Sequence, residues 1–186
     1  MTVAQQIDEL RLVQCIRERA AGHDVAFAEL FAAYRQRVFT ICRHLTRSRA
    51  DAEDVTQEVF VALLRALPSF RGESSLATFI HRIAVRLAVK QRMRTNRHDQ
   101  LRVTQTATTT AAHEARETNQ RLWLAMEQLS LEQRTVLALF AVDGLSHREI
   151  AAVLGIPEGT VRTRLMRARQ MLKQKLSALM ESRYAR

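Results

Sequence analysis

Residues 146–172 carry the pattern of two helices joined by a tight turn, and this pattern constrains the fold more than any other stretch of the chain. Ser146 and Glu149 have the spacing of a capping box that starts the first helix. Gly155 can end that helix with a positive φ angle, and Pro157 suits the first turn of the second helix. Apolar residues then recur every three or four positions, as in a buried helical stripe: Val161, Leu165, Ala168 and Leu172. The stretch predicts a helix-turn-helix.

The opposite face of this second helix is strongly basic. Residues 159–180 include six Lys or Arg side chains and no acid. Like charges three or four residues apart repel each other, so we interpret this run as a surface that faces DNA phosphates, with a merely soluble face as the alternative. Arg162 and Arg167 are the candidates for contacting bases, whereas Arg164 and Arg169 lie nearer the buried stripe and should contact phosphates or acidic neighbours.

Helical patterns cover most of the remaining chain, so the predicted fold class is all-α. The sequence has only five Gly and two Pro, and it lacks the sustained apolar–polar alternation of strands. The polar, Thr-rich segment at residues 95–117 cannot bury enough apolar surface to offset the entropy of ordering it. We predict two small helical modules joined by a flexible linker, with these bounds: N-terminal segment 1–23, first module 24–94, linker 95–117, second module 118–180 and tail 181–186.

The composition narrows the class of protein. A formal net charge of +10, from 29 Lys and Arg against 19 Asp and Glu, favours a polyanionic partner. No stretch approaches the ~18 apolar residues of a membrane span, and the polar N-terminus is not a signal peptide, so we expect a cytoplasmic protein without membrane insertion. We interpret Cys42 as a buried thiol rather than a metal ligand. Since no metal cluster, phosphate loop or activated nucleophile is evident in the sequence, we expect no catalytic residue, no cofactor and no enzyme activity.

The first module carries two charged clusters of opposite sign. Four basic residues follow one another at four-residue intervals on one predicted helix: Arg82, Arg86, Lys90 and Arg94. An anionic partner would relieve the repulsion along this row, so we expect it to contact nucleic acid, again with a soluble face as the alternative. An earlier helix begins with an acidic cluster that contains Asp51, Glu53, Asp54, Gln57 and Glu58. The four acids of this cluster either compensate the positive end of the helix dipole or, with Gln57, form a docking surface for a basic protein partner.

Together these features resemble the small bacterial sigma factors of the extracytoplasmic-function (ECF) group. In the first module the resemblance rests on residues 51–60, on Phe-Arg-Gly from position 70 and on Ala-Thr-Phe-Ile from position 77. In the second module it rests on Leu-Gly-Ile-Pro from position 154 and Gly-Thr-Val-Arg from position 159. Two motif sets in this order indicate the family more specifically than a helix-turn-helix alone would.

The resemblance implies a division of labour. The chain would bind core RNA polymerase at the β flap and at the β′ clamp helices, the latter through Asp51, Asp54, Gln57 and Glu58. A loop at residues 69–75 and the helix after it would capture unpaired bases of the −10 promoter element, with these candidate residues: Arg71, Ser74, Ser75, Phe79, Arg82, Arg86 and Lys90. The −35 element would be bound by Thr160, Arg162, Thr163, Arg164 and Arg167. An anti-sigma factor is a further implied partner.

Three positions depart from the usual pattern of the family. Phe79 stands where relatives usually have Trp, and Arg86 and Lys90 stand where Asn and Asp are common, so the usual −10 contacts do not transfer to the last two. The leading hypothesis is a sigma factor that binds core polymerase, directs it to specific promoters and assists promoter melting. The alternative is a stand-alone helix-turn-helix regulator, which would normally dimerise, but the sequence has no evident apolar seam for a dimer.

Overall fold

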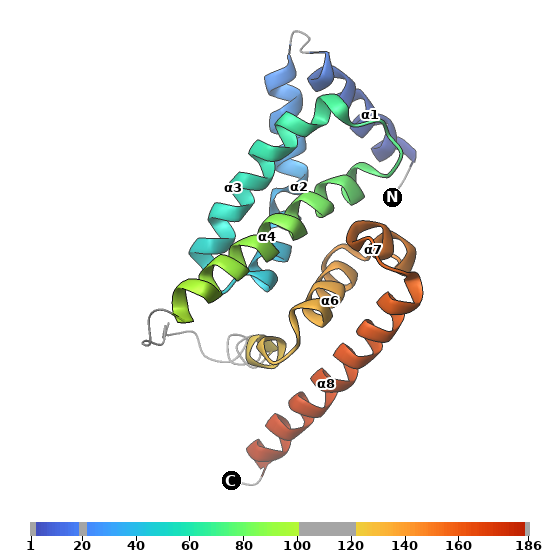
Figure 1. The fold of residues 1–186 in the computed structure, drawn as a ribbon. Helices are drawn as coiled ribbons and strands as arrows, with labels where there is room; N and C mark the ends of the chain where they lie inside the picture. Colours follow the sequence, from blue (N-terminus) through green and yellow to red (C-terminus); the bar gives the residue numbers. More distant parts are fainter. Residues whose placement is uncertain (1–2, 19–21, 101–121, 185–186) are drawn as a thin grey trace. The chain divides into compact units, whose positions relative to one another are not determined.

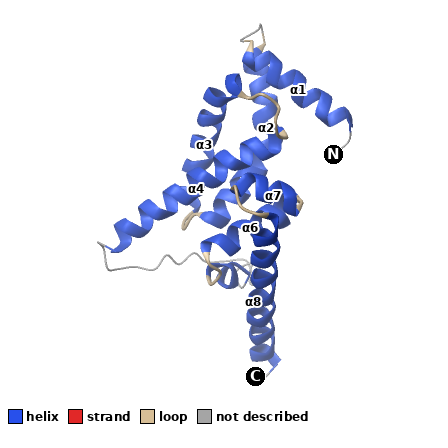
Figure 2. Cartoon of the chain, turned by 45° about the vertical axis from the view of Figure 1, so that its right-hand side comes forward, coloured by secondary structure: helices blue, strands red, loops and turns tan. Residues whose placement is uncertain are grey.

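The computed structural model describes residues 3–18, 22–100 and 122–184 (Figure 1). The chain divides into two compact units, Met1–Arg92 and Met93–Arg186. Within the described residues every regular element is a helix, as Figure 2 shows, and this confirms the predicted all-α class. The expected architecture of two small helical modules is confirmed as well.

The N-terminal unit is built on a core between packed helices. Its described elements are α1 (Val3–Arg17), α2 (His23–Leu45), α3 (Arg49–Ala66), the short 3-10 helix η1 (Leu67–Ser69) and α4 (Leu76–Gln100), whose last turns pass the boundary between the units. Both α1 and α3 pack against α2. The largest fully buried side chains are Leu30, Ile41, Leu45, Leu63, Leu67 and Ile80. Each such side chain contributes about 1.5–3 kcal/mol on burial, so this core stabilises the unit.

Serine caps fix the starts of two of these helices. The Oγ atom of Ser48 accepts a hydrogen bond from the backbone N–H of Asp51 at 3.0 Å and caps α3. The Oγ atom of Ser75 accepts from the N–H of Thr78 at 3.1 Å at the start of α4. A cap of this kind is worth about 1 kcal/mol. The two caps set the starts of α3 and α4, the helices before and after the loop at residues 69–75.

The helix α2 begins at His23, and its cap residue is Gly22, whose φ of 95° suits a residue without a side chain. The helix α4 was expected to end near Arg94, but it continues to Gln100 and so includes the first part of the predicted linker. The rest of that linker lies outside the described residues.

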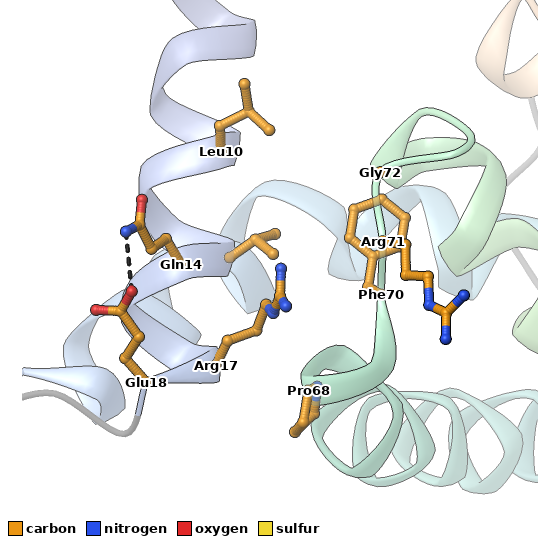
Figure 3. Close-up of a pocket in the computed structure, with 9 residues that line it drawn as sticks. Leu10, Gln14, Arg17, Glu18, Pro68, Phe70, Arg71 and Gly72 are labelled. Atoms are coloured by element: carbon orange, nitrogen blue, oxygen red, sulfur yellow. Dashed lines mark hydrogen bonds between the residues drawn. The ribbon is translucent and has the colours of Figure 1, made fainter.

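The N-terminal segment, for which no helix was predicted, contains α1. This helix packs on α2 and buries Val13 and Ile16. The Tyr34 hydroxyl on α2 donates a hydrogen bond to Oε1 of Glu9 at 2.7 Å. The segment therefore belongs to the folded N-terminal unit. It forms one wall of a hollow whose other wall is the loop after η1 (Figure 3).

The C-terminal unit packs its described helices around a second core. After a helical stretch at residues 122–127 come α6 (Leu131–Asp143), α7 (His147–Leu154) and α8 (Glu158–Tyr184). The helix α8 packs against both α6 and α7. Buried Arg134 joins the first stretch to α6, because its Nη2 atom donates to the carbonyl oxygens of Glu127 at 2.7 Å and Leu129 at 3.2 Å. Ser130 and Gln133 form a capping box at the start of α6, with both of its hydrogen bonds present.

Candidate functional site

The helices α7 and α8 form the predicted helix-turn-helix. The backbone N–H of Ser146 donates to Oε2 of Glu149 at 2.8 Å, and the N–H of Glu149 donates to Oγ of Ser146 at 3.3 Å, which completes the second capping box. Gly155 ends α7 with a φ of 65°, and Pro157 directly precedes α8. Because α7 and α8 also pack against each other, the turn holds α8 in a fixed orientation.

The helix α8 has one buried face and one exposed face, as its apolar spacing predicts. Val161, Leu165 and Ala168 are buried, while Leu172, the last residue of the predicted stripe, is partly exposed. The opposite side, which we call the recognition face, exposes Arg162, Thr163, Met166, Arg167 and Gln170. A convex helix surface of this kind fits the major groove of B-DNA, whose width of about 12 Å admits an α-helix.

Two arginines at the edge of α8 are held by the neighbouring helix α6. The side chain of Arg164 is only 26% exposed, and its Nη2 atom lies 2.8 Å from Oε2 of Glu132 on α6. The guanidinium of Arg169 lies over the ring of Phe140, with 4.5 Å between its carbon and the ring centroid. Both arginines therefore contact α6, and a cation–π contact like the second is worth about 0.5–1 kcal/mol.

The polar residues of the recognition face make contacts within α8 itself. Arg162 is exposed and pairs with Glu158 at 3.2 Å. Since an exposed ion pair is worth only about 0–1 kcal/mol, the guanidinium can exchange this partner for a base edge. The Thr163 hydroxyl donates to the carbonyl oxygen of Gly159 at 2.9 Å, and Thr160 is partly exposed one turn earlier than Arg164.

Four of the residues predicted to contact the −10 element meet around one hollow, which we call the loop cavity. It has a volume of about 290 Å³, and the loop after η1 and the first turns of α4 form its walls. The four predicted residues in its lining are Arg71, Ser74, Phe79 and Arg82. Phe70 completes an aromatic wall, because its ring centroid lies 4.9 Å from that of Phe79. Ser69 and the acid Glu73 complete the lining. An aromatic wall with polar and cationic side chains beside it suits an unpaired base.

The other three predicted −10 residues are not brought to the loop cavity. Ser75 caps α4, and its Oγ atom lies 2.8 Å from Oγ1 of Thr78. Arg86 and Lys90 are exposed one and two turns beyond Arg82 and do not line the cavity. Their four-residue spacing continues the basic row along α4, which suits contact with a phosphate backbone more than with a base.

The predicted docking residues also divide into two sets. Asp54, Gln57 and Glu58 are exposed along α3 and line what we call the acidic groove, of about 620 Å³, together with Val61, Ala62, Arg65 and Leu87. The carboxylate of Asp51 instead accepts hydrogen bonds from Nε2 of Gln91 at 2.6 Å and from Oγ of Ser48 at 2.7 Å. Asp51 therefore ties the start of α3 to α4 and does not line the groove.

The sequence analysis missed the apolar side chains beside these acids. Val61 is 51% exposed and lines the acidic groove, and Leu64 is 42% exposed on the same helix. Val61 follows Glu58 by three residues and Gln57 by four, so helical spacing alone places it on the acidic face. An apolar side chain among acids suits a partner helix that carries both basic and apolar residues.

One titratable group outside these surfaces, the thiol of Cys42, has a clearly shifted pKa. Cys42 is fully buried, as predicted, and burial raises the pKa of its thiol to about 12, although a hydrogen bond with Thr56 acts in the opposite direction. No three His, Cys, Asp or Glu side chains gather closely enough to hold a metal ion in the described ranges. Among the described helices, none is long and apolar enough to cross a membrane.

Comparison with known proteins gives independent evidence on the family. The family model of Sigma-70 region 2 matches residues 30–98, and that of Sigma-70, region 4 matches residues 119–172. The ECF RNA polymerase sigma-E factor of Escherichia coli (strain K12) is 31% identical over 192 residues, which cover 95% of this chain and 98% of that protein. The protein of the same name from Haemophilus influenzae is 31% identical over 195 residues, or 96% of this chain and 100% of its own length.

A solved structure agrees with these sequence matches. CnrH, in its complex with the cytosolic domain of CnrY, is similar to this chain with a TM-score of 0.70 and 27% identity, covering 92% of this chain and 97% of CnrH. The two matched sigma regions include the loop cavity and the helix-turn-helix, respectively. From these matches and this fold it follows that the chain belongs to the ECF sigma factors, transcription initiation factors that direct RNA polymerase to promoters.

Proposed function

We propose that this sigma factor divides its work among the acidic groove, the loop cavity and the recognition face. The observation that carries the proposal is that each set of candidate residues lies on a physically different kind of surface. The acidic groove is negatively charged with apolar side chains, the loop cavity is a hollow with aromatic and basic walls, and the recognition face is a convex basic helix. These surfaces suit a basic protein helix, an unpaired base and duplex DNA, respectively.

The acidic groove is the proposed docking site for the clamp helices of the polymerase β′ subunit. Asp54 and Glu58 supply negative charge, Gln57 supplies a hydrogen-bonding amide, and Val61 supplies an apolar contact between them. Asp51 supports this surface indirectly, because its bonds to Ser48 and Gln91 fix the start of α3 against α4. Opposite charges across such an interface chiefly raise the association rate and the specificity for the correct partner.

The loop cavity is the proposed site for an unpaired base of the −10 element. Phe79 offers a ring for stacking, and Arg71, Ser74 and Arg82 offer hydrogen-bond donors around it. Holding a base outside the helix favours the open form of the DNA, which is how the chain would assist melting. Arg86 and Lys90 would contact phosphates of the same region along α4.

The recognition face is the proposed contact with the −35 element. Arg162 and Arg167 are exposed and are assigned to base edges, with Thr163 between them. Arg164 is assigned to a phosphate, because Glu132 holds its guanidinium at the side of α8. Thr160 lies near the start of α8, where backbone N–H groups also favour a phosphate.

Two further partners, an anti-sigma factor and the β flap of core polymerase, are proposed from the similar proteins and not from particular residues of this chain. Because the similar protein CnrH is bound to CnrY, and the family commonly works with anti-sigma factors, we propose that an anti-sigma factor covers one or more of these surfaces. The β flap of core polymerase is the proposed partner of the C-terminal unit. The polymerase supplies the catalysis in this scheme, and the chain acts in the cytoplasm without catalysing a reaction itself.

Core RNA polymerase reconstituted with the full chain tests the proposed docking. Charge reversal at Asp54 and Glu58 together (Asp54→Lys, Glu58→Lys) should weaken core binding by at least about tenfold, since facing like charges cost several kcal/mol. Glu53→Lys is the matched control, because Glu53 is exposed on α3 but pairs with Arg49 at 2.8 Å and does not line the groove. An equal loss in the control, or none in the double variant, would contradict the assignment.

A further inference from the structure

The recognition face carries one large apolar side chain, that of Met166, which is 59% exposed. The structure describes every residue from Ala125 to Ser177, and within this range Met166 is the only exposed large apolar side chain. It points away from the buried stripe of Val161, Leu165 and Ala168, so the core of the unit does not use it. A single exposed apolar side chain is common on protein surfaces, and its role therefore depends on its neighbours.

The neighbours of Met166 on α8 are exposed and polar. Arg162 and Thr163 lie one turn before it, Gln170 lies one turn after it, and Arg167 lies beside it. Protein interfaces are centred on groups of large apolar and aromatic side chains in packed pockets. Met166 is instead one apolar group within a polar and basic surface, which favours DNA over a protein as the occupant of this face.

The edges of DNA bases offer one apolar partner for such a side chain. In the major groove this partner is the C5-methyl group of thymine, since the other groups on the base edges are hydrogen-bond donors or acceptors. The Met side chain has three rotatable bonds and a polarizable thioether, so it can adapt its shape to a methyl group. Burying one such group changes an equilibrium constant about fourfold.

We propose that Met166 contacts the C5-methyl group of a thymine and makes the −35 interaction depend on that methyl group. The inference rests on the proposed function, because α8 must lie in the major groove of the −35 duplex. Met166 follows Arg162 by four residues, or about 6 Å along the helix, which equals about two base-pair steps of 3.4 Å. The thymine is therefore expected within about two base pairs of the base that Arg162 contacts, on either strand.

Replacement of thymine by uracil tests this inference, because uracil makes the same hydrogen bonds and lacks only the methyl group. Core polymerase with the full chain first selects preferred duplexes from promoter DNA that is randomised over the −35 element. Each thymine of a selected duplex is then replaced by uracil in turn, and binding is titrated. The wild type should lose about fourfold in affinity at one position. Met166→Ala should lose at least as much on the thymine duplex and should bind the thymine and uracil duplexes equally.

Two further variants are matched to Met166→Ala. Met166→Leu keeps an apolar side chain at this exposed position and should retain part of the preference for thymine over uracil. Gln128→Ala should behave as the wild type, because Gln128 is exposed just after the helical stretch at residues 122–127 and not on α8.

Three results would overturn the inference. The wild type could bind every uracil duplex as tightly as the thymine duplex, which would leave the proposed function intact if a −35 sequence is still selected. The preference for thymine could persist in Met166→Ala, which would assign the methyl contact to another residue. Met166→Ala could weaken binding to core polymerase without DNA, which would identify a protein contact. If the holoenzyme selected no −35 sequence at all, the proposed function would fail and the inference with it.

Discussion

In the N-terminal unit the side chains proposed to contact DNA surround a hollow beside a loop, whereas in the C-terminal unit they project from the convex face of α8. Phe70 is almost fully buried in the wall of the loop cavity, while Met166 on the recognition face is 59% exposed. An unpaired base has left its stack, so both of its faces need cover. A base in duplex DNA shows only its edge, which a projecting side chain reaches from the major groove. The shape of each surface thus matches a different state of the promoter.

The two surfaces also differ in what holds them in place. The loop cavity depends on contact between the loop and α4, through the pair Phe70–Phe79. The recognition face depends on the packing of α8 against α6 and α7, with Arg164–Glu132 and Arg169–Phe140 at its edge. A change confined to the N-terminal unit should therefore alter binding of the unpaired −10 strand alone. A change confined to the C-terminal unit should alter binding of the −35 duplex alone.

Removing the buried arginine of the C-terminal unit should give the largest effect. Arg134→Ala removes the donors to the carbonyl oxygens of Glu127 and Leu129 and leaves both acceptors poorly satisfied. The C-terminal unit should lose about 2–4 kcal/mol of stability, and with it duplex −35 binding, while binding of the unpaired −10 strand persists. Thermal unfolding followed by hydrogen exchange in each unit measures this. Exposed Arg148→Ala, on α7, should cost less than about 0.5 kcal/mol, and equal destabilisation of both units by Arg134→Ala would contradict the comparison.

Alkaline pH should instead weaken the N-terminal unit. The pKa of Cys42 is raised from 9.0 to about 12 by burial, so the folded state keeps the proton that the unfolded chain loses first. This contribution to stability is present below pH 9 and is lost as the pH rises toward 12, amounting to about 2–3 kcal/mol between pH 9 and pH 11. Chemical unfolding at several pH values measures it. The same series on Cys42→Ala should lack this component, and an unchanged slope would show that the thiol is not responsible.

Truncating the aromatic wall should affect only the unpaired strand. Phe79→Ala should weaken binding of a premelted −10 strand by about 1–3 kcal/mol, because a stacking surface is lost, and leave −35 duplex binding unchanged. Fluorescence anisotropy with each DNA measures both. Phe79→Trp retains an aromatic ring and should bind at least as well as the wild type. A loss on duplex DNA that matches the loss on the single strand would break the proposed separation.

Releasing Arg164 should give the smallest effect. Glu132→Gln removes the carboxylate that holds its guanidinium, so affinity for −35 duplex should rise by less than about 1 kcal/mol at low salt and less still at high salt. A salt titration of duplex binding measures this change. Glu127→Gln is the control, since the Glu127 side chain is exposed in the same unit. A clear loss of affinity in Glu132→Gln alone would show that the ion pair positions Arg164 rather than competing with DNA.

The features that the sequence predicted are those set by local spacing. The capping box at Ser146 depends on Glu149, three positions later, so the pattern is visible without any tertiary information. The buried stripe of α8 follows from helical periodicity, and the structure buries Val161, Leu165 and Ala168 as expected. The acidic helix was likewise visible in the sequence itself, whereas the loop at residues 69–75 became a candidate surface only through the resemblance to the family.

The features that the sequence did not predict depend on residues far apart in the chain. Asp51 is held by Gln91, forty positions away, and this distinguishes it from Asp54 although both lie in one acidic cluster. Arg164 is held by Glu132 on another helix, which periodicity within α8 cannot show. Leu10 and Val13 of α1 share a hollow with Phe70 of the loop after η1, and local patterns treat these two segments independently. Packing between elements decides these roles, and it has no signature in local spacing.

The central claim is that the two units contact different states of the promoter, and one crossed measurement tests it most directly. Holoenzymes with Arg82→Ala, in the loop cavity, or Arg167→Ala, on the recognition face, are each titrated with a premelted −10 strand and with a −35 duplex. We predict that Arg82→Ala loses about tenfold on the premelted strand alone and that Arg167→Ala loses about tenfold on the duplex alone. Equal losses of both variants on both DNAs would contradict the claim.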